Sequence, residues 1–268
     1  MPRTTRHPSL ARRAAVGLGV ALLVLAVAAP ATTAAAAKTK LVSRSTDGTR
    51  GDSYSRDPSI SGNGRYVAFE SNATNLVGND TNGKRDVFVH DRKTGKTKRV
   101  SKRSDGTEGD NDSGDPSISD DGRYIAFDSN ATNLVKNDTN GVWDVFVHDR
   151  KTGKTKRVSK RSDGTEGDNY SGDPSISDDG RYLAFESDAT NLVGNDTNGA
   201  RDIFVHDRKT HKTKRVSKRS DGTEGDSTSY DPSISGNGRY VAFASYATNL
   251  VKNDTNGSKD VFRRGPLH

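Results

Sequence analysis

Short apolar runs, separated by Gly, Asn, Asp and Pro, recur along the chain from residue 38 onward. The clearest run is residues 57–71, which read DPSISGNGRYVAFES. Asn-Gly between two apolar runs is a strong hairpin signal, because both residues tolerate the positive φ that tight turns require. We therefore predict a strand at 59–61, a turn at 62–64 and a second strand at 65–71.

The same stretch returns at Asp115, Asp173 and Asp231, and each start lies 58 residues after the one before. A fixed period of this length is typical of a propeller, a solenoid or an array. Within the first unit, β-branched and aromatic residues predict a third strand at 86–90 and a fourth at 97–101. No segment after residue 38 has a helical period, so the prediction is an all-β protein.

The fourth unit has its first three strands, the third at 260–263, and lacks a fourth. Residues 38–44 (KTKLVSR) match the fourth strand of the first unit, 96–102 (KTKRVSK). We predict a four-bladed β-propeller of four-stranded blades, closed by the N-terminal strand completing the last blade. Such a ring leaves only short, protected edges. An open array of four stacked units is the alternative.

Strands two and three are apolar on both faces, as expected for blades that pack against neighbours on each side. Eight phenylalanines should anchor this packing: Phe69, Phe88, Phe127, Phe146, Phe185, Phe204, Phe243 and Phe262. The fourth strand is basic, with Lys98, Arg99, Lys102 and Arg103. Charge on an outer strand blunts edge-to-edge pairing. An outer rim that binds an anionic polymer is the alternative interpretation.

Residues 1–37 have the pattern of a secretory signal peptide, with four arginines before an apolar run at 14–29 and small residues at 34–37. A membrane anchor is disfavoured because the run is short for a span of about 20 residues, and no second apolar segment follows. A twin-arginine signal at Arg12-Arg13 is a minor option. We expect an exported protein, secreted or attached to the cell envelope, whose mature domain is 38–268 and has no membrane span.

Export also changes the charge. The chain has 42 Lys and Arg against 35 Asp and Glu, a net charge of +7. The leader holds four arginines and no acid, which leaves 38 against 35, or +3, for the mature chain. This small excess gives no support to a nucleic-acid partner. The absence of cysteine excludes disulfides and thiolate metal sites.

The repeated motifs resemble the TolB-like group of bacterial WD-type β-propellers. The matching positions in the first unit are Pro58-Ser59, Asn63-Gly64 and Arg65-Tyr66-Val67-Ala68-Phe69. Gly62 stands where this family often has proline. The resemblance implies a propeller over nearly all of 38–268. It implies no particular activity, because propellers have many functions and the α/β domain of TolB is not predicted within 38–268.

Oxygen-bearing side chains recur at i, i+2 and i+6 around a glycine in the connection before each third strand. This spacing resembles part of a calcium loop. The candidate ligands are Asp80, Asn82, Asp86, Asp138, Asn140, Asp144, Asp196, Asn198, Asp202, Asp254, Asn256 and Asp260. The alternative is a local turn, in which Asp and Asn side chains bond neighbouring backbone N–H groups. Calcium is the only cofactor that the sequence indicates.

His90, His148 and His206 each precede an aspartate at the end of a third strand, whereas the fourth unit has Arg263 and Arg264 there. No nucleophile recurs beside these pairs, so we expect solvated or locally bonded histidines. Trp143, the only tryptophan, is a candidate exposed stacking group.

Four near-equal units favour a repeated binding surface over a unique catalytic pair. We therefore predict a secreted, non-enzymatic binding or scaffold protein, monomeric, with a protein or glycan ligand. The alternatives are a calcium-binding surface protein and a propeller-type lyase or glycosidase. The enzyme would need residues unique to one blade in the central mouth, and the sequence shows none.

Overall fold

A computed structural model describes residues 36–268, of which 40–268 form one compact unit. The predicted signal peptide, residues 1–37, lies almost wholly outside the described residues and stays a prediction. The described chain contains fifteen β-strands and no helix, which confirms the all-β prediction. It follows that no helix of residues 36–268 could cross a membrane.

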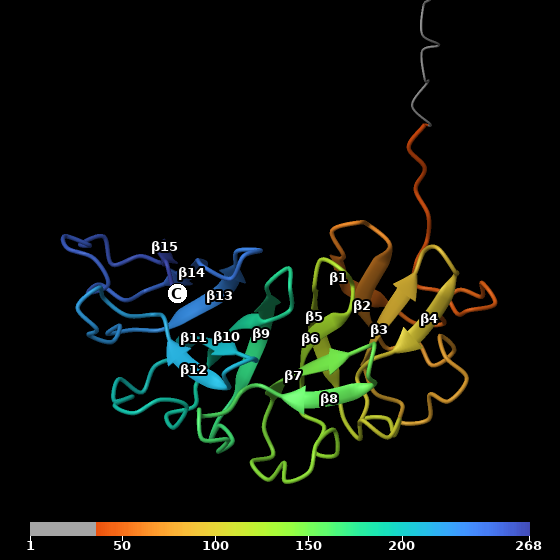
Figure 1. Cartoon of the computed structure of the whole chain (residues 1–268), viewed down its shortest axis with the longest axis horizontal. Coiled ribbons are helices and arrows are strands. Elements are labelled where there is room, and N and C mark those ends of the chain that lie inside the picture. The colour runs from red at the N-terminus through yellow and green to blue at the C-terminus, as the bar shows by residue number, and fades with distance from the viewer. Residues whose placement is uncertain (1–35) are drawn as a thin grey trace, which may run out of the picture. The chain divides into compact units, whose positions relative to one another are not determined.

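The strands form four antiparallel sheets whose members follow chain order (Figure 1). The first sheet contains β1 (Ser55–Ile60), β2 (Tyr66–Ser71), β3 (Asp86–Asp91) and β4 (Lys96–Arg99). The second contains β5 (Ser113–Ile118), β6 (Tyr124–Ser129), β7 (Asp144–Asp149) and β8 (Lys154–Arg157). The third contains β9 (Ser171–Ile176), β10 (Tyr182–Ser187), β11 (Asp202–Asp207) and β12 (Lys212–Arg215). The fourth contains only β13 (Ser229–Ile234), β14 (Val241–Ser245) and β15 (Asp260–Arg264).

The first hairpin differs in detail from the prediction. Strand β1 begins earlier, at Ser55, and its pairing with β2 shifts register between Arg56 and Ser59. The irregularity contains Pro58, which has no N–H to donate to a ladder. In the turn, Gly64 alone takes a positive φ, and its N–H donates to the carbonyl of Ser61 (2.7 Å). Asn63 contributes its side chain instead, which accepts a hydrogen bond from the N–H of Arg65 (2.9 Å).

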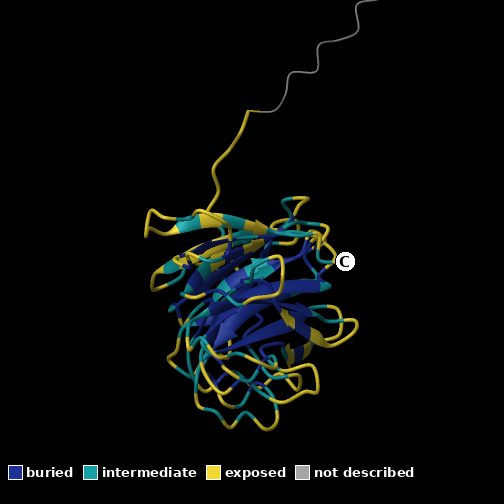
Figure 2. Cartoon of the chain, turned by 90° about the vertical axis from the view of Figure 1, so that its left-hand side faces the viewer, coloured by how far each residue is buried: buried dark blue, intermediate teal, exposed yellow. Residues whose placement is uncertain are grey.

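The hydrophobic core lies between consecutive sheets, as the two-sided apolar strands predict (Figure 2). One cluster joins Val87 and Val100 of the first unit to Ile118 and Phe127 of the second. In each sheet a phenylalanine of the second strand stacks on one of the third, with ring centroids 5.8–6.0 Å apart. Seven of the eight predicted anchors are buried, and Phe262 is only partly so.

Phe262 is less buried because β15 has a free outer edge. Among the described residues β15 pairs only with β14, and Val261 is 80% exposed. Residues 40–44 form no ladder with it. Leu41 is 48% exposed, and Arg44 makes an isolated bridge with Arg50. The predicted closing pair between residues 38–44 and 260–263 is therefore not formed in this structure. Figure 1 shows the first and last sheets at the two ends of the series.

Hydrogen bonds from backbone N–H groups to serine hydroxyls tie each sheet to the next along the inner strands. The N–H of Ile118 donates to the hydroxyl of Ser59 (3.1 Å), and the N–H of Ile176 to that of Ser117 (3.1 Å). The four inner strands β1, β5, β9 and β13 thereby line one open central groove. Consecutive sheets pack on one another around it, whereas the first and fourth sheets share no comparable contact.

Candidate functional site

The predicted calcium loop of the first unit already holds a cation, the guanidinium of Arg99. Its Nη1 lies 2.9 Å from Asp86 and 3.3 Å from Asp80, and its Nη2 lies 2.7 Å from Glu108. Asn82 donates to Asp86 (3.1 Å) and accepts from the N–H of Lys84 (2.9 Å), the local turn that the sequence left open. Arg99, which the sequence placed on the basic outer rim, is instead only 9% exposed.

The second and third units repeat this arrangement with Arg157 and Arg215. Arg157 lies 2.9 Å from Asp144 and 3.2 Å from Asp138, and Arg215 shows the same pattern with Asp202 and Asp196. Asn140 and Asn198 bond Asp144 and Asp202 in turn. A calcium ion in these loops would therefore have to displace a buried guanidinium.

The fourth loop differs from the other three. Asn256 donates to Asp260 (2.7 Å), but within residues 36–268 no arginine pairs with Asp260 or Asp254. Asp260 is half-buried, whereas its equivalents are fully buried. The structure thus brings the predicted ligands of the first three loops together around an arginine, whereas in the fourth loop the contact is between Asn256 and Asp260.

Burial governs the protonation of the paired carboxylates. It raises the pKa of Asp138 to about 6, an effect that Arg157 opposes and Asp144 reinforces. Burial likewise raises the pKa of Asp144, against the charge of Arg157 and a 2.5 Å hydrogen bond from Ser159. Such buried networks of charged and hydrogen-bonded groups hold the loops in place.

The three histidines are buried and locally bonded, which confirms the expectation. Nδ1 of His148 lies 2.9 Å from the hydroxyl of Thr155, and burial lowers the pKa of His148 to about 4. The adjacent Asp149 is paired with Arg123 (2.8 Å), so no histidine–aspartate catalytic pair forms.

The outer strands carry a second repeated feature, three lysine pairs. We name the set Lys98, Lys102, Lys156, Lys160, Lys214 and Lys218 the outer lysines. None of them forms an ion pair within residues 36–268. Burial and the neighbouring charges of Lys98 and Arg99 lower the pKa of Lys102, and Lys160 is shifted in the same way. Each pair is therefore a crowded positive site without a counterion.

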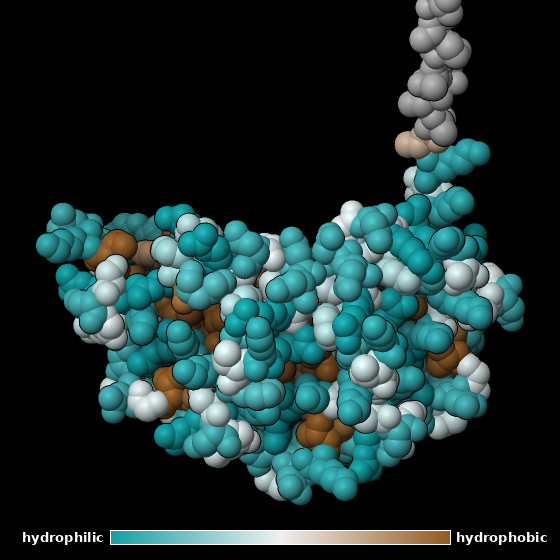
Figure 3. Space-filling model, in the orientation of Figure 1, coloured by the Kyte–Doolittle hydropathy of each residue, from teal (hydrophilic) through white to brown (hydrophobic). Residues whose placement is uncertain are grey.

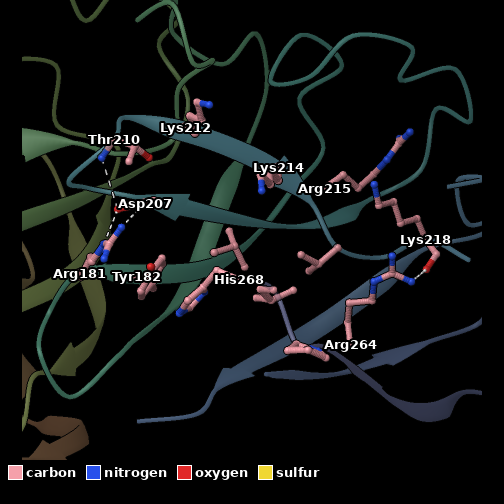
Figure 4. Close-up of a pocket in the computed structure, with 14 residues that line it drawn as sticks. Arg181, Tyr182, Asp207, Thr210, Lys212, Lys214, Arg215, Lys218, Arg264 and His268 are labelled. Carbon is pink, nitrogen blue, oxygen red and sulfur yellow. Dashed lines mark hydrogen bonds and ion pairs between the residues drawn. The ribbon is translucent and has the colours of Figure 1, made fainter. Parts of the chain in front are cut away.

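The third pair borders a cavity of about 380 Å³ between β12 and the residues after β15 (Figure 4). Val205, Val216 and Leu267 are among its lining residues, as are Lys214, Lys218 and Arg264. Arg264 stands where the earlier units have histidine, and its Nη1 donates to the carbonyl of Lys218 (3.1 Å). Figure 3 shows one face of the molecule, which is largely hydrophilic and has small apolar spots. The cavity suits a ligand with an anionic group and a small apolar part.

Sequence reasoning missed one residue set that is unique to a single sheet. Glu70 and Glu186 recur as buried carboxylates on β2 and β10, each with an arginine, Arg85 or Arg201. In the second sheet the equivalent residues are Asp128 and Trp143. The signal was present as a paired departure from the repeat, but nothing in the sequence showed that the two positions meet.

No family model matches the chain, and no curated protein matches its sequence. Solved structures to which the chain is similar include TolB from Acinetobacter baumannii, with 16% identity and a TM-score of 0.47 over 82% of this chain and 42% of that one. A putative TolB from Agrobacterium tumefaciens has 17% identity and a TM-score of 0.44, over 80% and 82% of the two chains. An oligogalacturonate lyase in complex with manganese has 14% identity and a TM-score of 0.49, over 82% and 54%.

TolB proteins are thus among the structures that this chain resembles, in agreement with the blade motifs. The chain spans about two fifths of the length of the first of them. All three TM-scores are below 0.5, so the architecture described above rests on the sheets and repeats of this chain. The neighbours include TolB proteins and a lyase, and no activity is transferred from either.

We expect Arg157→Ala to lower the free energy of unfolding by about 3–5 kcal/mol, because it leaves two buried carboxylates without their cation. Lys156→Ala removes the exposed neighbour on the same strand and should change it by less than about 0.5 kcal/mol. Urea unfolding of the full chain at pH 7 measures both values. Equal losses for the two variants would contradict a structural role for the buried guanidinium.

Proposed function

We propose that this chain is an exported, non-enzymatic binding protein whose outer strands present repeated cationic sites to a glycan or protein ligand. The observation that carries the proposal is the set of outer lysines, which recur at equal sequence spacing without ion-pair partners. A ligand with several anionic groups would contact more than one pair at once. Linked contacts of this kind raise the overall affinity above that of a single site.

The remaining candidate groups support binding rather than catalysis. The repeated carboxylates are paired with arginine, and the histidines are held by threonine. A lyase or glycosidase would need an acid and a base that differ in environment and face one substrate. The groove aspartates belong to an Asp-Pro pair that recurs in all four sheets, which is typical of a repeated surface more than of a single catalytic pair, so the enzyme alternative ranks second.

The proposed binding surface includes a completed fourth sheet. We infer that residues 38–44 are its missing strand, in the register that β4 has with β3. In that register Leu41 would lie opposite Phe262, and Lys40 opposite Arg263, as Arg99 and Lys98 lie opposite Phe88 and Val89.

Two sequence departures support this register. Leu41 stands where Arg99 would approach the loop carboxylates, and Arg50 stands where the other units have glutamate. Compared with the other units, the arginine is absent from the outer-strand position and present at the glutamate position. In the completed sheet, Arg50 would supply the cation that Asp254 and Asp260 lack. The hydroxyl of Ser43 would also meet Asp260, as that of Ser101 meets Asp86 (2.5 Å).

The calcium alternative is best supported at the fourth loop, which has no guanidinium. It predicts that millimolar calcium raises the Tm of the full chain relative to EDTA, because an ion bound only by the folded state stabilises it. Replacing Asp254 and Asp260 by Asn should abolish the rise, while Asp110→Asn, at an exposed acid of another loop, should preserve it. An unchanged Tm rejects the alternative.

For the binding function, we expect a triple variant with Lys102, Lys160 and Lys218 changed to Ala to lose about tenfold or more in affinity for an acidic polysaccharide, because repeated contacts are lost together. The matched control changes Lys93, Lys151 and Lys209, exposed lysines of the turns between third and fourth strands, to Ala. Both variants lose the same charge. Biolayer interferometry against immobilised polyuronate, polyphosphate and neutral glucan measures the affinities, and equal losses would count against specific outer sites.

For the completed sheet, we expect Lys40→Cys combined with Arg263→Cys to form a disulfide under mild oxidation, since the inferred register places the two side chains side by side. The chain has no other cysteine. A cross-linked monomer on a non-reducing gel supports closure within one chain, and a cross-linked dimer indicates strand exchange between copies. The single-cysteine variants are the controls. Failure to cross-link beyond their level would argue against the pairing.

A further inference from the structure

Acidic groups from all four sheets converge in the central groove. Four Asp-Pro pairs, beginning at Asp57, Asp115, Asp173 and Asp231, line an open hollow of about 450 Å³. The two end members have cationic neighbours, because Asp57 lies 3.4 Å from Arg56 and Asp231 lies 3.8 Å from Lys259. Within the described residues, Asp115 and Asp173 form no ion pair. The excess negative charge is therefore at the middle of the groove.

Beneath the groove, a buried carboxylate of each of the first three sheets reaches toward the inner strand of the next sheet. Glu70 accepts a hydrogen bond from the N–H of Asp115 (3.0 Å), and Glu186 accepts one from the N–H of Asp231 (3.2 Å). Both glutamates are ion-paired with arginine, although burial and the charge of Asp173 raise the pKa of Glu186 to about 7. Arg85 lies 3.2 Å from Glu70, and Arg201 lies 2.6 Å from Glu186.

The junction between the second and third sheets has the carboxylate without the cation. Asp128 accepts a hydrogen bond from the backbone of Asp173, but Trp143 stands at the arginine position. Gly114 likewise stands where Arg56 contacts Glu70 in the first sheet. Asp128 is 2% exposed, and its Oδ1 has no hydrogen-bond partner. A buried carboxyl oxygen without a partner is costly, so this position stands apart from its equivalents.

The charges around Asp128 are almost all negative. Burial, followed by the charges of Asp115 and Asp173, raises its pKa well above the usual range. Burial and the charges of Asp173, Glu70 and Asp57 raise the pKa of Asp115 to about 6. Burial also raises the pKa of Asp173 and of the Tyr170 phenol, which lies beside Asp128 at Gly172. Arg85 and Arg201 oppose these shifts from the flanking junctions.

We propose that the middle of the central groove, between Asp115 and Asp173 with Asp128 beneath them, binds a guanidinium or primary ammonium group of an organic ligand. In the first and third sheets the equivalent carboxylate, Glu70 or Glu186, is ion-paired with an arginine of this chain. A cationic group from outside would supply the missing countercharge, and charge-assisted hydrogen bonds to carboxylates are the strong kind.

A metal ion is the less suitable occupant. The three potential ligand residues whose oxygens lie within 4.8 Å of one another are Asp57, Glu70 and Asp115. Glu70 is already bound to two guanidinium groups, from Arg56 and Arg85. The carboxylates at the middle junction form no such compact group among the described residues.

Isothermal titration calorimetry of the full chain with triarginine peptide and with spermidine tests the proposal. We expect binding of at least one of them at pH 7.5 and low salt, with release of up to one proton as the cation draws Asp128 into its charged form. Affinity should fall by about tenfold between pH 7.5 and pH 5, because Asp115 takes up a proton below a pKa of about 6 and loses its charge. Triarginine binding alone indicates a peptide partner, and spermidine binding alone a free polyamine.

Asp128→Asn should weaken binding about tenfold and abolish the proton release, since the amide keeps the shape and removes the charge. The matched control is Asp231→Asn, at a groove aspartate that already faces Lys259, and it should change affinity by less than about twofold. If Asp128→Asn does not fold, Asp115→Asn takes its place. Absence of binding by both cations, equal losses in the two variants, or displacement of the bound cation by stoichiometric calcium would each overturn the proposal. None of these results depends on the outer lysines, so the glycan or protein function is tested separately.

Discussion

Neighbouring sheets of this protein share most of their hydrophobic core. Three of the four core clusters join consecutive sheets, so Val87 of the first sheet packs with Phe127 of the second. The remaining cluster, around Phe69 and Phe88, lies within the first sheet. The chain has only 29% hydrophobic residues, and sharing apolar faces between neighbouring sheets lets this small number form a core. The same dependence explains the ends of the series, where Phe262 is half-covered and Val261 is exposed.

Buried arginines hold the loops to the outer strands through ion pairs. Arg99 and its equivalents join the outer strand to the long connection before the third strand, through carboxylates that are nearly inaccessible to water. A guanidinium presents several donors in a fixed plane and can satisfy three acidic groups at once. The cation in the first three of these oxygen-rich loops is therefore an arginine of the chain itself. A calcium-like spacing of oxygen ligands thus occurs at three sites that hold a guanidinium.

In a protein built of near-equal units, the departures from the repeat are the informative residues. Asp128 with Trp143 leaves a buried carboxyl unpaired in the central groove, and Arg264 replaces a buried histidine beside the cavity at Lys218. Both lie where two sheets meet, so a change in one unit alters a surface shared with another. Repeated groups such as the outer lysines supply multivalency, whereas these single changes give one junction a chemistry of its own.

The sequence by itself determined the local structure: strand positions, hairpins, the 58-residue unit and the two-sided apolar strands follow from neighbouring residues and a strict period. It also indicated locally bonded histidines. The burial of Arg99, the unpaired Oδ1 of Asp128 and the convergence of four aspartates in one groove came only from the tertiary structure. Their partners lie 9 to 58 residues away or in another sheet, and no local pattern encodes which of many charged side chains will meet once the sheets pack.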